Sequence, residues 1–360
     1  MTLHEGKKDI RELTFDELKE ALEAMGEKAY RVSQIFSWIH SKAAGSFDEM
    51  SDISKALREK LKENFYLSLP ETETVRISKQ DGTKKYLFKL EDGECIESVR
   101  MIYHHGISVC ISSQVGCRQG CSFCASTLGG LVRNLTASEM AGQIYAISRE
   151  SKERVSNVVI MGIGEPLDNY DEVLRFLKLI SDERGYGLGG RNITLSTCGL
   201  VPKIRELADE GLKLTLALSL HAVTDEKRQA IMPVAKRYSL HELMAAVDYY
   251  FEKTGRRVSF EYSLIKGVND SDGDVKGLAE LAGRRNCHVN LIPVNPVTER
   301  GLKEPDRTHV LEFKNKLEKR GINATIRREM GRDIEGACGQ LRRQMRAVPF
   351  SKGESVPDEA

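Results

Sequence analysis

Three cysteines, Cys117, Cys121 and Cys124, lie within eight consecutive residues in the pattern Cys-x3-Cys-x2-Cys. Thiolates bind iron–sulfur clusters and zinc alike. A structural zinc site needs a fourth ligand, and no cysteine or histidine follows closely in the sequence. Three thiolates on a four-iron cluster leave one iron open for a small molecule. We therefore expect an iron–sulfur site; the alternatives are three buried cysteines or zinc with a distant fourth ligand.

Two further cysteines stand apart from this motif. Cys110 precedes it by seven residues, and Cys338 lies between small residues and near several arginines. Such neighbours favour an accessible, reactive thiolate, whereas a lone cysteine is by default a small buried hydrophobe. The residues alone leave both readings of Cys338 open. Buried, unreactive thiols are expected at Cys95, Cys198 and Cys287.

The elements that must position the cysteine motif alternate between strand and helix patterns beyond residue 106. The pattern predicts strands at 107–112, 157–161, 192–196, 213–219, 257–264 and 288–293. Six such βα units predict an α/β fold with a partial (β/α)6 TIM-like barrel. The cysteine motif follows the first strand, and barrel enzymes place their chemistry at the C-terminal ends of their strands.

Small and polar residues follow the other predicted strands. Glycine permits close approach of a ligand to the backbone, and carboxylates and carbonyls accept hydrogen bonds from an ammonium group. Taken singly, these residues also fit a plain turn, a strand end or an ordinary histidine. Their occurrence after successive strands favours one pocket, formed by Gly164, Glu165, Ser196, Ser219, Leu220, His221 and Asn295.

The N-terminal part reads differently from the barrel. Thr14 and Glu17 form a capping box before an apolar helical pattern, and Asp81-Gly82 and Asp92-Gly93 are typical of tight hairpin turns. The helices suit a scaffold or an RNA contact, and the sequence does not choose between them. The predicted division is a helical accessory domain (1–70), an antiparallel linker sheet (71–106), the core with its C-terminal loop (107–350) and a disordered tail (351–360).

Composition excludes several classes of protein. With 40% hydrophobic and 30% charged residues among 360, the chain suits a soluble globular protein. It has no apolar run of membrane-spanning length and no apolar signal core, so a cytoplasmic location is expected. The net charge of +1 gives no global basic field. The arginines between 327 and 346 form either a solvated surface or a local phosphate contact.

The cysteine spacing resembles the radical S-adenosylmethionine superfamily, in which the open iron binds the methionine moiety and a 5′-deoxyadenosyl radical is released. A narrower resemblance, over nearly the whole chain, is to the RlmN family of ribosomal and transfer RNA adenine-C2 methyltransferases. It is carried by the segments 110–117, 133–135, 162–167, 195–197, 219–221 and 336–339.

This resemblance implies roles for the residues above. Cys117, Cys121 and Cys124 would hold a 4Fe-4S cluster, and the strand-end residues would contact S-adenosylmethionine. Cys338 would receive a methyl group from one S-adenosylmethionine, and a second would generate the radical that activates this methyl group. The methylene radical would add to carbon 2 of a flipped adenine, and Cys110 would release the adduct through a transient disulfide. Glu97 matches the family's proton acceptor.

The implied partners are 23S ribosomal RNA, at the peptidyl transferase centre, and transfer RNAs, at the adenine next to the anticodon. A low-potential electron donor such as flavodoxin or ferredoxin and a monomeric state are also implied. The nearest alternative is a Cfr-type enzyme that methylates carbon 8. A more distant one is a non-catalytic RNA-binding protein with a structural metal site, which would need neither the strand-end pocket nor Cys338.

Overall fold

The computed structural model describes residues 4, 6–104, 106–295 and 300–334. In this part of the chain, ten strands form one curved sheet in the order β14-β13-β12-β11-β10-β9-β6-β5-β4-β3. Seven of them run parallel: β6 (Gly106–Ile111), β9 (Val155–Ile160), β10 (Ile193–Thr197), β11 (Thr215–Ser219), β12 (Val258–Leu264), β13 (Cys287–Pro293) and β14 (Ala324–Ile326).

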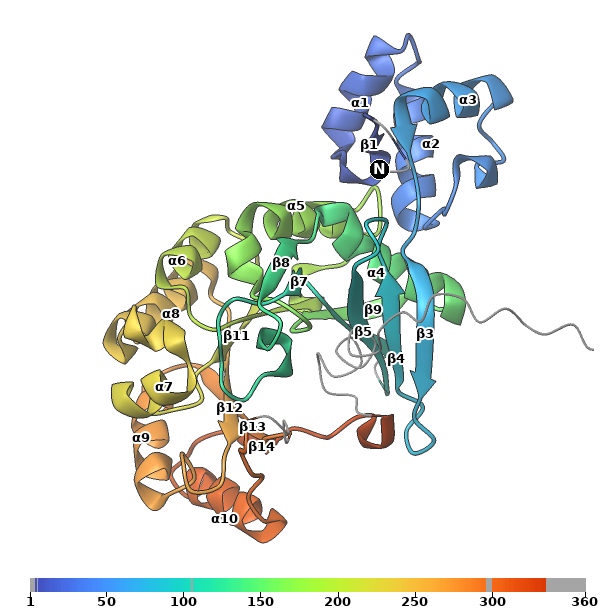
Figure 1. Ribbon diagram of the computed structural model, residues 1–360. Coiled ribbons are helices and arrows are strands. Elements are labelled where there is room, and N and C mark those ends of the chain that lie inside the picture. Colours follow the sequence, from blue (N-terminus) through green and yellow to red (C-terminus); the bar gives the residue numbers. More distant parts are fainter. Residues whose placement is uncertain (1–3, 5, 105, 296–299, 335–360) are drawn as a thin grey trace, which may run out of the picture.

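Helices connect these parallel strands and pack along the outer side of the curved sheet (Figure 1). Their apolar faces and the buried strands form one continuous core. The predicted (β/α)6 arrangement is confirmed, and β14 adds a strand that the sequence pattern did not show. The helices are α4 (Ala137–Ser151), α5 (Tyr170–Ser181), α6 (Val201–Asp209), α7 (Asp225–Ile231), α8 (Leu240–Thr254), α9 (Asp272–Ala282) and α10 (Arg307–Glu318).

Three antiparallel strands extend the same sheet beyond β6: β3 (Glu71–Ile77), β4 (Lys84–Lys89) and β5 (Cys95–Tyr103). Gly82 and Gly93 adopt positive φ in the two hairpin turns, as the Asp-Gly pairs predict. Lys85 lies opposite Val99, and Val99 lies opposite Cys110. Because side chains alternate along a strand, Lys85, Glu97 and Cys110 share one face of the sheet.

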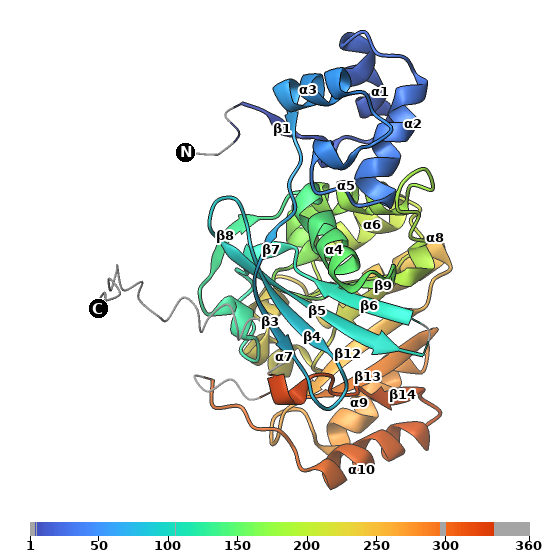
Figure 2. The same cartoon turned by 90° about the vertical axis from the view of Figure 1, so that its right-hand side faces the viewer.

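The N-terminal helices α1 (Phe15–Ala24), α2 (Tyr30–Phe36) and α3 (Lys55–Asn64) form a separate layer above the sheet, best seen in Figure 2. A two-residue ladder between β1 (Lys8–Asp9) and β2 (Phe65–Tyr66) joins the beginning and end of this layer. The predicted capping box is present: Thr14 accepts from the Glu17 N–H, and Glu17 accepts from the Thr14 N–H.

Buried polar contacts fix the helical layer to the core. The His40 imidazole hydrogen-bonds the Tyr145 hydroxyl of α4 at 2.9 Å, and both side chains are fully buried. Arg175 of α5 donates to Glu17 at 2.7 Å. Gly185 packs so tightly here that a Cβ would lie 2.9 Å from both His40 and Phe36. The division of the chain into domains remains a prediction, but the helical layer is packed closely against the core.

Candidate functional site

The loop with the three clustered cysteines is closed by a small hairpin. Its strands are β7 (Gln114–Gly116) and β8 (Leu131–Asn134), which pair antiparallel on either side of the loop. Gly116 has φ +82°, and a Cβ there would lie 2.0 Å from the Gly130 carbonyl oxygen, so only glycine fits. The Cys117 N–H donates to that same carbonyl at 2.9 Å. The backbone therefore holds both ends of the loop together.

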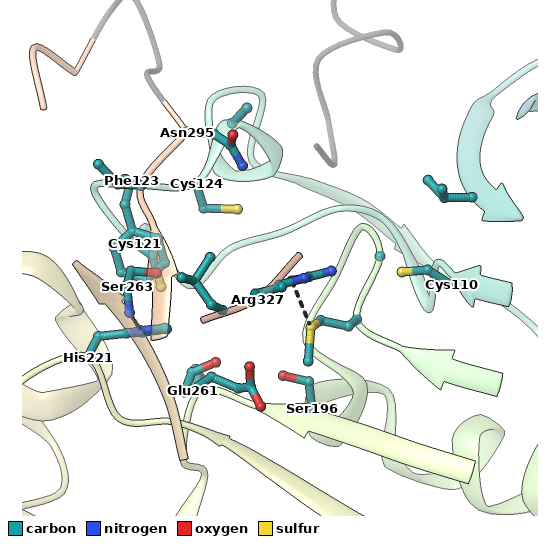
Figure 3. A pocket seen from close by; sticks show the side chains of 18 of the residues that line it. Cys110, Cys121, Phe123, Cys124, Ser196, His221, Glu261, Ser263, Asn295 and Arg327 are labelled. Atoms are coloured by element: carbon teal, nitrogen blue, oxygen red, sulfur yellow. Dashed lines mark hydrogen bonds between the residues drawn. The ribbon is translucent and has the colours of Figure 1, made fainter. Parts of the chain in front are cut away.

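The three cysteines line one cavity of about 530 Å³, a size typical of small-molecule sites. Figure 3 shows the loop with Cys121 and Cys124 on one side of this cavity and Cys110 on the opposite side, with the Cys110 and Cys124 sulfur atoms directed inward. The Cys110 side chain extends into the cavity from β6. Arg327, which follows β14, lies between Cys110 and the cysteine loop. The fold thus gathers four of the cysteines singled out in the sequence around one space.

Burial shapes the acidity of these thiols. It raises the pKa of Cys117 to about 12, with a further contribution from the neighbouring Cys124, and it also raises the pKa of Cys121. Bound iron ions would reverse this effect, because a coordinating thiol is deprotonated. Among the described residues, no three His, Cys, Asp or Glu side chains are arranged around a single metal ion. A four-iron cluster requires another arrangement, since each thiolate binds a separate iron.

The surroundings of the loop fit such a cluster. Cys121 belongs to an apolar group whose other members include Cys198, Ile231, Met232 and Val294. This apolar shell limits the access of water, which is one of the protein's means of tuning a cluster. The three thiols at the edge of a large cavity leave room for a small molecule beside them. The residues present are therefore compatible with a cluster that keeps one iron open.

The segment after β9 is bound tightly to the segment before the cysteine loop. The Ser113 and Gln114 N–H groups donate to the Ile163 carbonyl at 2.9 and 3.1 Å. Gly164 has φ +115°, and a Cβ there would approach Gln114 to 2.7 Å. Gly164 and the following Glu165 both line the cavity. The glycine is thus required for close packing of two backbone segments beside the pocket.

Glu165 is buried and already engaged with the protein. Its carboxylate accepts from the Leu167 N–H at 3.0 Å and the Cys198 N–H at 2.7 Å. Burial raises the pKa of Glu165, although the Cys198 N–H acts in the opposite direction. The group joins the ends of β9 and β10 at the cavity wall.

His221 adopts φ +55°, a conformation that few non-glycine residues take. Its Nδ1 accepts from the Ser263 N–H at 2.9 Å, and burial lowers its pKa to about 3. The ring is therefore neutral and carries its proton on Nε2. It contacts Phe123 edge-on, with ring centroids 4.6 Å apart, so the end of β11 touches the cysteine loop.

The structure brings most of the predicted pocket residues together. Gly164, Glu165, Ser196, Ser219, His221 and Asn295 all line the cavity that the three cysteines line. Leu220 does not line this cavity: its side chain is buried in the core, and its carbonyl accepts a hydrogen bond from Arg228. Glu97 does not belong to the cavity lining; it forms a buried ion pair with Lys85 at 3.0 Å, on the same face of the sheet as Cys110. Cys338 and the tail 351–360 lie outside the described residues.

Two charged residues near the cavity escaped the sequence reasoning. Glu261 lines the cavity from β12 and accepts from the Ser259 hydroxyl and the Asn290 amide. A carboxylate within an otherwise uncharged strand was the available signal. Arg228 is fully buried and donates to the carbonyls of Cys198, Ser219 and Leu220, which connects the ends of β10 and β11. The residue pattern of α7 gave no indication of this role of Arg228.

Comparison with known proteins agrees with this geometry. The family model described as "Radical SAM superfamily" matches residues 111–279, and the model "Ribosomal RNA large subunit methyltransferase N-terminal domain" matches residues 8–67. A solved radical SAM methyltransferase from Sphaerobacter thermophilus superposes with a TM-score of 0.88 at 43% identity, covering 92% of this chain and 98% of that one. Fold and site thus define a radical S-adenosylmethionine enzyme.

Two curated relatives narrow the assignment. A protein of Lachnospira eligens is 59% identical over 93% of this chain and 95% of its own length. One of Lachnoclostridium phytofermentans is 57% identical over 94% and 95%. Both are named probable dual-specificity RNA methyltransferase RlmN. The chain belongs to the RlmN family. Membership implies a 4Fe-4S cluster and S-adenosylmethionine as cofactors.

The described residues also bear on the membrane question. Within them, no helix is both long enough and apolar enough to cross a bilayer.

Proposed function

We propose that this enzyme methylates carbon 2 of an adenine in 23S ribosomal RNA, at the peptidyl transferase centre, and of the adenine next to the anticodon in certain transfer RNAs. The name of the two relatives, dual-specificity RNA methyltransferase, supports an RNA substrate with two specificities, and the matching N-terminal family model names large-subunit ribosomal RNA. The observation that carries the chemistry is the position of Cys110 opposite the clustered cysteines in one cavity.

In this proposal Cys117, Cys121 and Cys124 would hold a 4Fe-4S cluster, which would supply the electron that cleaves S-adenosylmethionine. Gly164, Glu165, Ser196, Ser219, His221 and Asn295, with the backbone of Leu220, surround the bound S-adenosylmethionine. The neutral His221 ring presents an N–H donor, and buried Glu165 keeps the neighbouring strand ends in place. These residues position the cofactor and exclude water.

Cys338 and Cys110 act on the methyl group. The Cys338 sulfur attacks the methyl carbon of S-adenosylmethionine, and S-adenosylhomocysteine leaves. A second S-adenosylmethionine, cleaved by one electron, would yield methionine and a 5′-deoxyadenosyl radical, which would take a hydrogen atom from the S-methyl group and leave as 5′-deoxyadenosine. The resulting methylene radical would add to carbon 2 of adenine, which must leave its stack to reach the site. The adduct would then give up one electron to the oxidised cluster. Once carbon 2 has lost its proton, the Cys110 thiolate would attack the Cys338 sulfur, giving a disulfide. The electron pair of the broken sulfur–carbon bond would stay on the former methyl carbon, which takes up a proton to become the product methyl group. Glu97, on the same face of the sheet as Cys110, accepts the proton from carbon 2.

Product analysis tests this proposal directly. The anaerobically reconstituted enzyme, supplied with a low-potential donor such as reduced flavodoxin, is incubated with both RNA classes, and nucleosides are analysed by mass spectrometry. We expect 2-methyladenosine; 8-methyladenosine as the main product would contradict the assignment of the carbon. Gel filtration of the same sample tests the proposed monomer.

Cysteine variants test the route. Cys338→Ala should abolish methylation, and Cys110→Ala should accumulate a covalent enzyme–RNA adduct. Cys287→Ala is the matched control, because this cysteine begins β13 and does not belong to the cavity lining. Unchanged methylation by Cys338→Ala would exclude a methyl carrier and favour direct transfer.

A further inference from the structure

The segment 331–334, which follows β14 and precedes the C-terminal stretch containing Cys338, is tied to the turn between β3 and β4. The Ser78 hydroxyl donates to Asp333 Oδ1 at 2.7 Å, and the Lys79 N–H donates to Asp333 Oδ2 at 2.9 Å. The Gly331 N–H donates to Asp81 Oδ2 at 3.0 Å. Three hydrogen bonds therefore join segments that are about 250 residues apart in the sequence.

Hydrogen bonds within the β3–β4 turn orient the side chains that bind the segment 331–334. Buried Ser78 also accepts from the N–H groups of Gln80 and Asp81, which fixes its hydroxyl in place. Although burial acts in the opposite direction, the N–H groups of Gly331 and Thr83 lower the pKa of Asp81 to about 2. The Ser78 hydroxyl likewise lowers the pKa of Asp333. Both carboxylates are thus ionised acceptors at neutral pH.

The residues just before this tie border the cavity. Arg327 and Met330 line it, and the Arg327 N–H donates to the Leu291 carbonyl at 2.8 Å. Met330 packs against the small apolar group that contains Cys110, Val99 and Met101. The chain therefore passes along the cavity beside Cys110 and is then held by the β3–β4 turn.

We propose that the β3–β4 turn, through Ser78, Lys79 and Asp81, anchors the base of the methyl-carrying segment and keeps Cys338 within reach of both Cys110 and the cofactor. This inference rests on the proposed role of Cys338 as methyl carrier. The antiparallel extension of the sheet then has a structural role of its own, the anchoring of this segment, which generation of the radical does not require. Asp333 is then a positioning residue, not a catalytic one.

Chain length shows why an anchor matters. Cys338 follows Asp333 by five residues, so its Cα can lie at most about 17 Å from the anchored Asp333 Cα. Without the anchor, the next backbone tie is at Arg327, eleven residues away, and the limit grows to about 37 Å. A longer tether lowers the effective concentration of the thiol, by about threefold for this change in length.

The test measures this effective concentration in the reconstituted holoenzyme without RNA. The protein is equilibrated anaerobically in glutathione buffers of graded ratio, quenched by alkylation, and the Cys110–Cys338 disulfide is quantified by peptide mass spectrometry. We expect the double variant Asp81→Ala/Asp333→Ala, which removes all three hydrogen bonds, to shift the equilibrium about threefold toward the two thiols. Asp333→Ala alone leaves the Gly331–Asp81 bond, seven residues from Cys338, and should shift it by less than about twofold. Asp333→Asn, which keeps one acceptor oxygen, should lie between Asp333→Ala and the wild type. Asp272→Ala removes an exposed carboxylate paired with Lys316 and is the control.

Hydrogen exchange provides a second readout that is independent of activity. The Lys79 amide should lose protection in Asp333→Ala but not in Asp272→Ala. If Cys338 becomes methylated normally but the double variant matches Asp272→Ala in the disulfide equilibrium and Asp333→Ala matches it in hydrogen exchange, the anchor is refuted and the proposed function stands. If the wild-type enzyme never carries a methyl group on Cys338, the proposed function fails, and the inference fails with it.

Discussion

The two halves of the ten-stranded sheet place their reactive groups in different ways. In the parallel half, side chains from the ends of β9, β10 and β11 meet around the cavity, because parallel strands end at one edge of a sheet. In the antiparallel half, Lys85, Glu97 and Cys110 lie side by side across three neighbouring strands. In the proposed function, the first half binds the cofactor, and the second supplies the thiol and the proton acceptor.

This difference shows how one sheet can present two kinds of reactive group from separate regions to a single cavity. Cys110 lies on β6, the strand where the parallel and antiparallel halves meet. It faces the cavity from the side opposite the cysteine loop. In the proposed mechanism, the radical and the Cys110 thiol therefore reach one substrate from opposite sides of this cavity. Variants in one half of the sheet should therefore have effects that variants in the other half do not have.

The largest effect is expected from removing a cluster ligand in the parallel half. Cys121→Ala should lose the iron–sulfur absorption and lower RNA methylation by at least ~10³-fold, since the radical can no longer be generated. Iron content, visible spectra and product analysis measure this. Cys287→Ala should retain both properties. A full complement of iron in Cys121→Ala would show that this residue is not a ligand.

A break in the antiparallel half should destabilise the protein and spare the cluster. Lys85→Met leaves the Glu97 carboxylate buried without its ion-pair partner, so the free energy of unfolding should fall by about 3–5 kcal/mol. Chemical denaturation measures the loss, and iron content after reconstitution should stay at the wild-type level.

Lys84→Met is a matched control for this change. Lys84 is the preceding residue, points to the opposite face and pairs with the part-exposed Glu150, so its loss should cost no more than about 1 kcal/mol. Equal losses in the two variants would contradict the buried pair. Loss of iron from Lys85→Met would show that the halves are not separable.

The effect that is smallest at neutral pH concerns neither half of the sheet but the contact between the core and the N-terminal helices. Burial, aided by Arg11, lowers the pKa of His40 to about 3. The unfolded chain binds this proton below about pH 6.5 and the folded protein does not, so stability is complete above that pH. It should fall by up to ~1.4 kcal/mol per pH unit as the pH drops toward 3.

Denaturation curves from pH 7 to pH 4 check this prediction. His40→Gln should show a shallower decline with acid than the wild type. His221 has its pKa lowered to about 3 by burial as well, and its contribution is common to both proteins, so the difference isolates His40. Identical slopes would mean that His40 is not protected from protonation.

Much of the site could be predicted from the sequence because its signals are local. Three thiols at fixed spacing, a Gly-x-Gly-Glu turn and a Ser-Leu-His strand end each report short-range geometry, and parallel strands bring such ends together. The hairpin turns and the Thr14–Glu17 capping box followed from backbone preferences in the same way. Leu220 shows the limit: its place in the motif was visible, but the inward direction of its side chain was not.

What the sequence determined by itself was therefore the chemistry at each strand end and the order of the strands. Only the tertiary structure decided which distant groups meet. The Lys85–Glu97 pair depends on strand register, Arg228 depends on how α7 packs over three carbonyls, and the tie from Asp333 to Ser78 crosses some 255 residues. Such contacts carry no local pattern, because their free energy comes from burial and from partners that only the folded chain brings together.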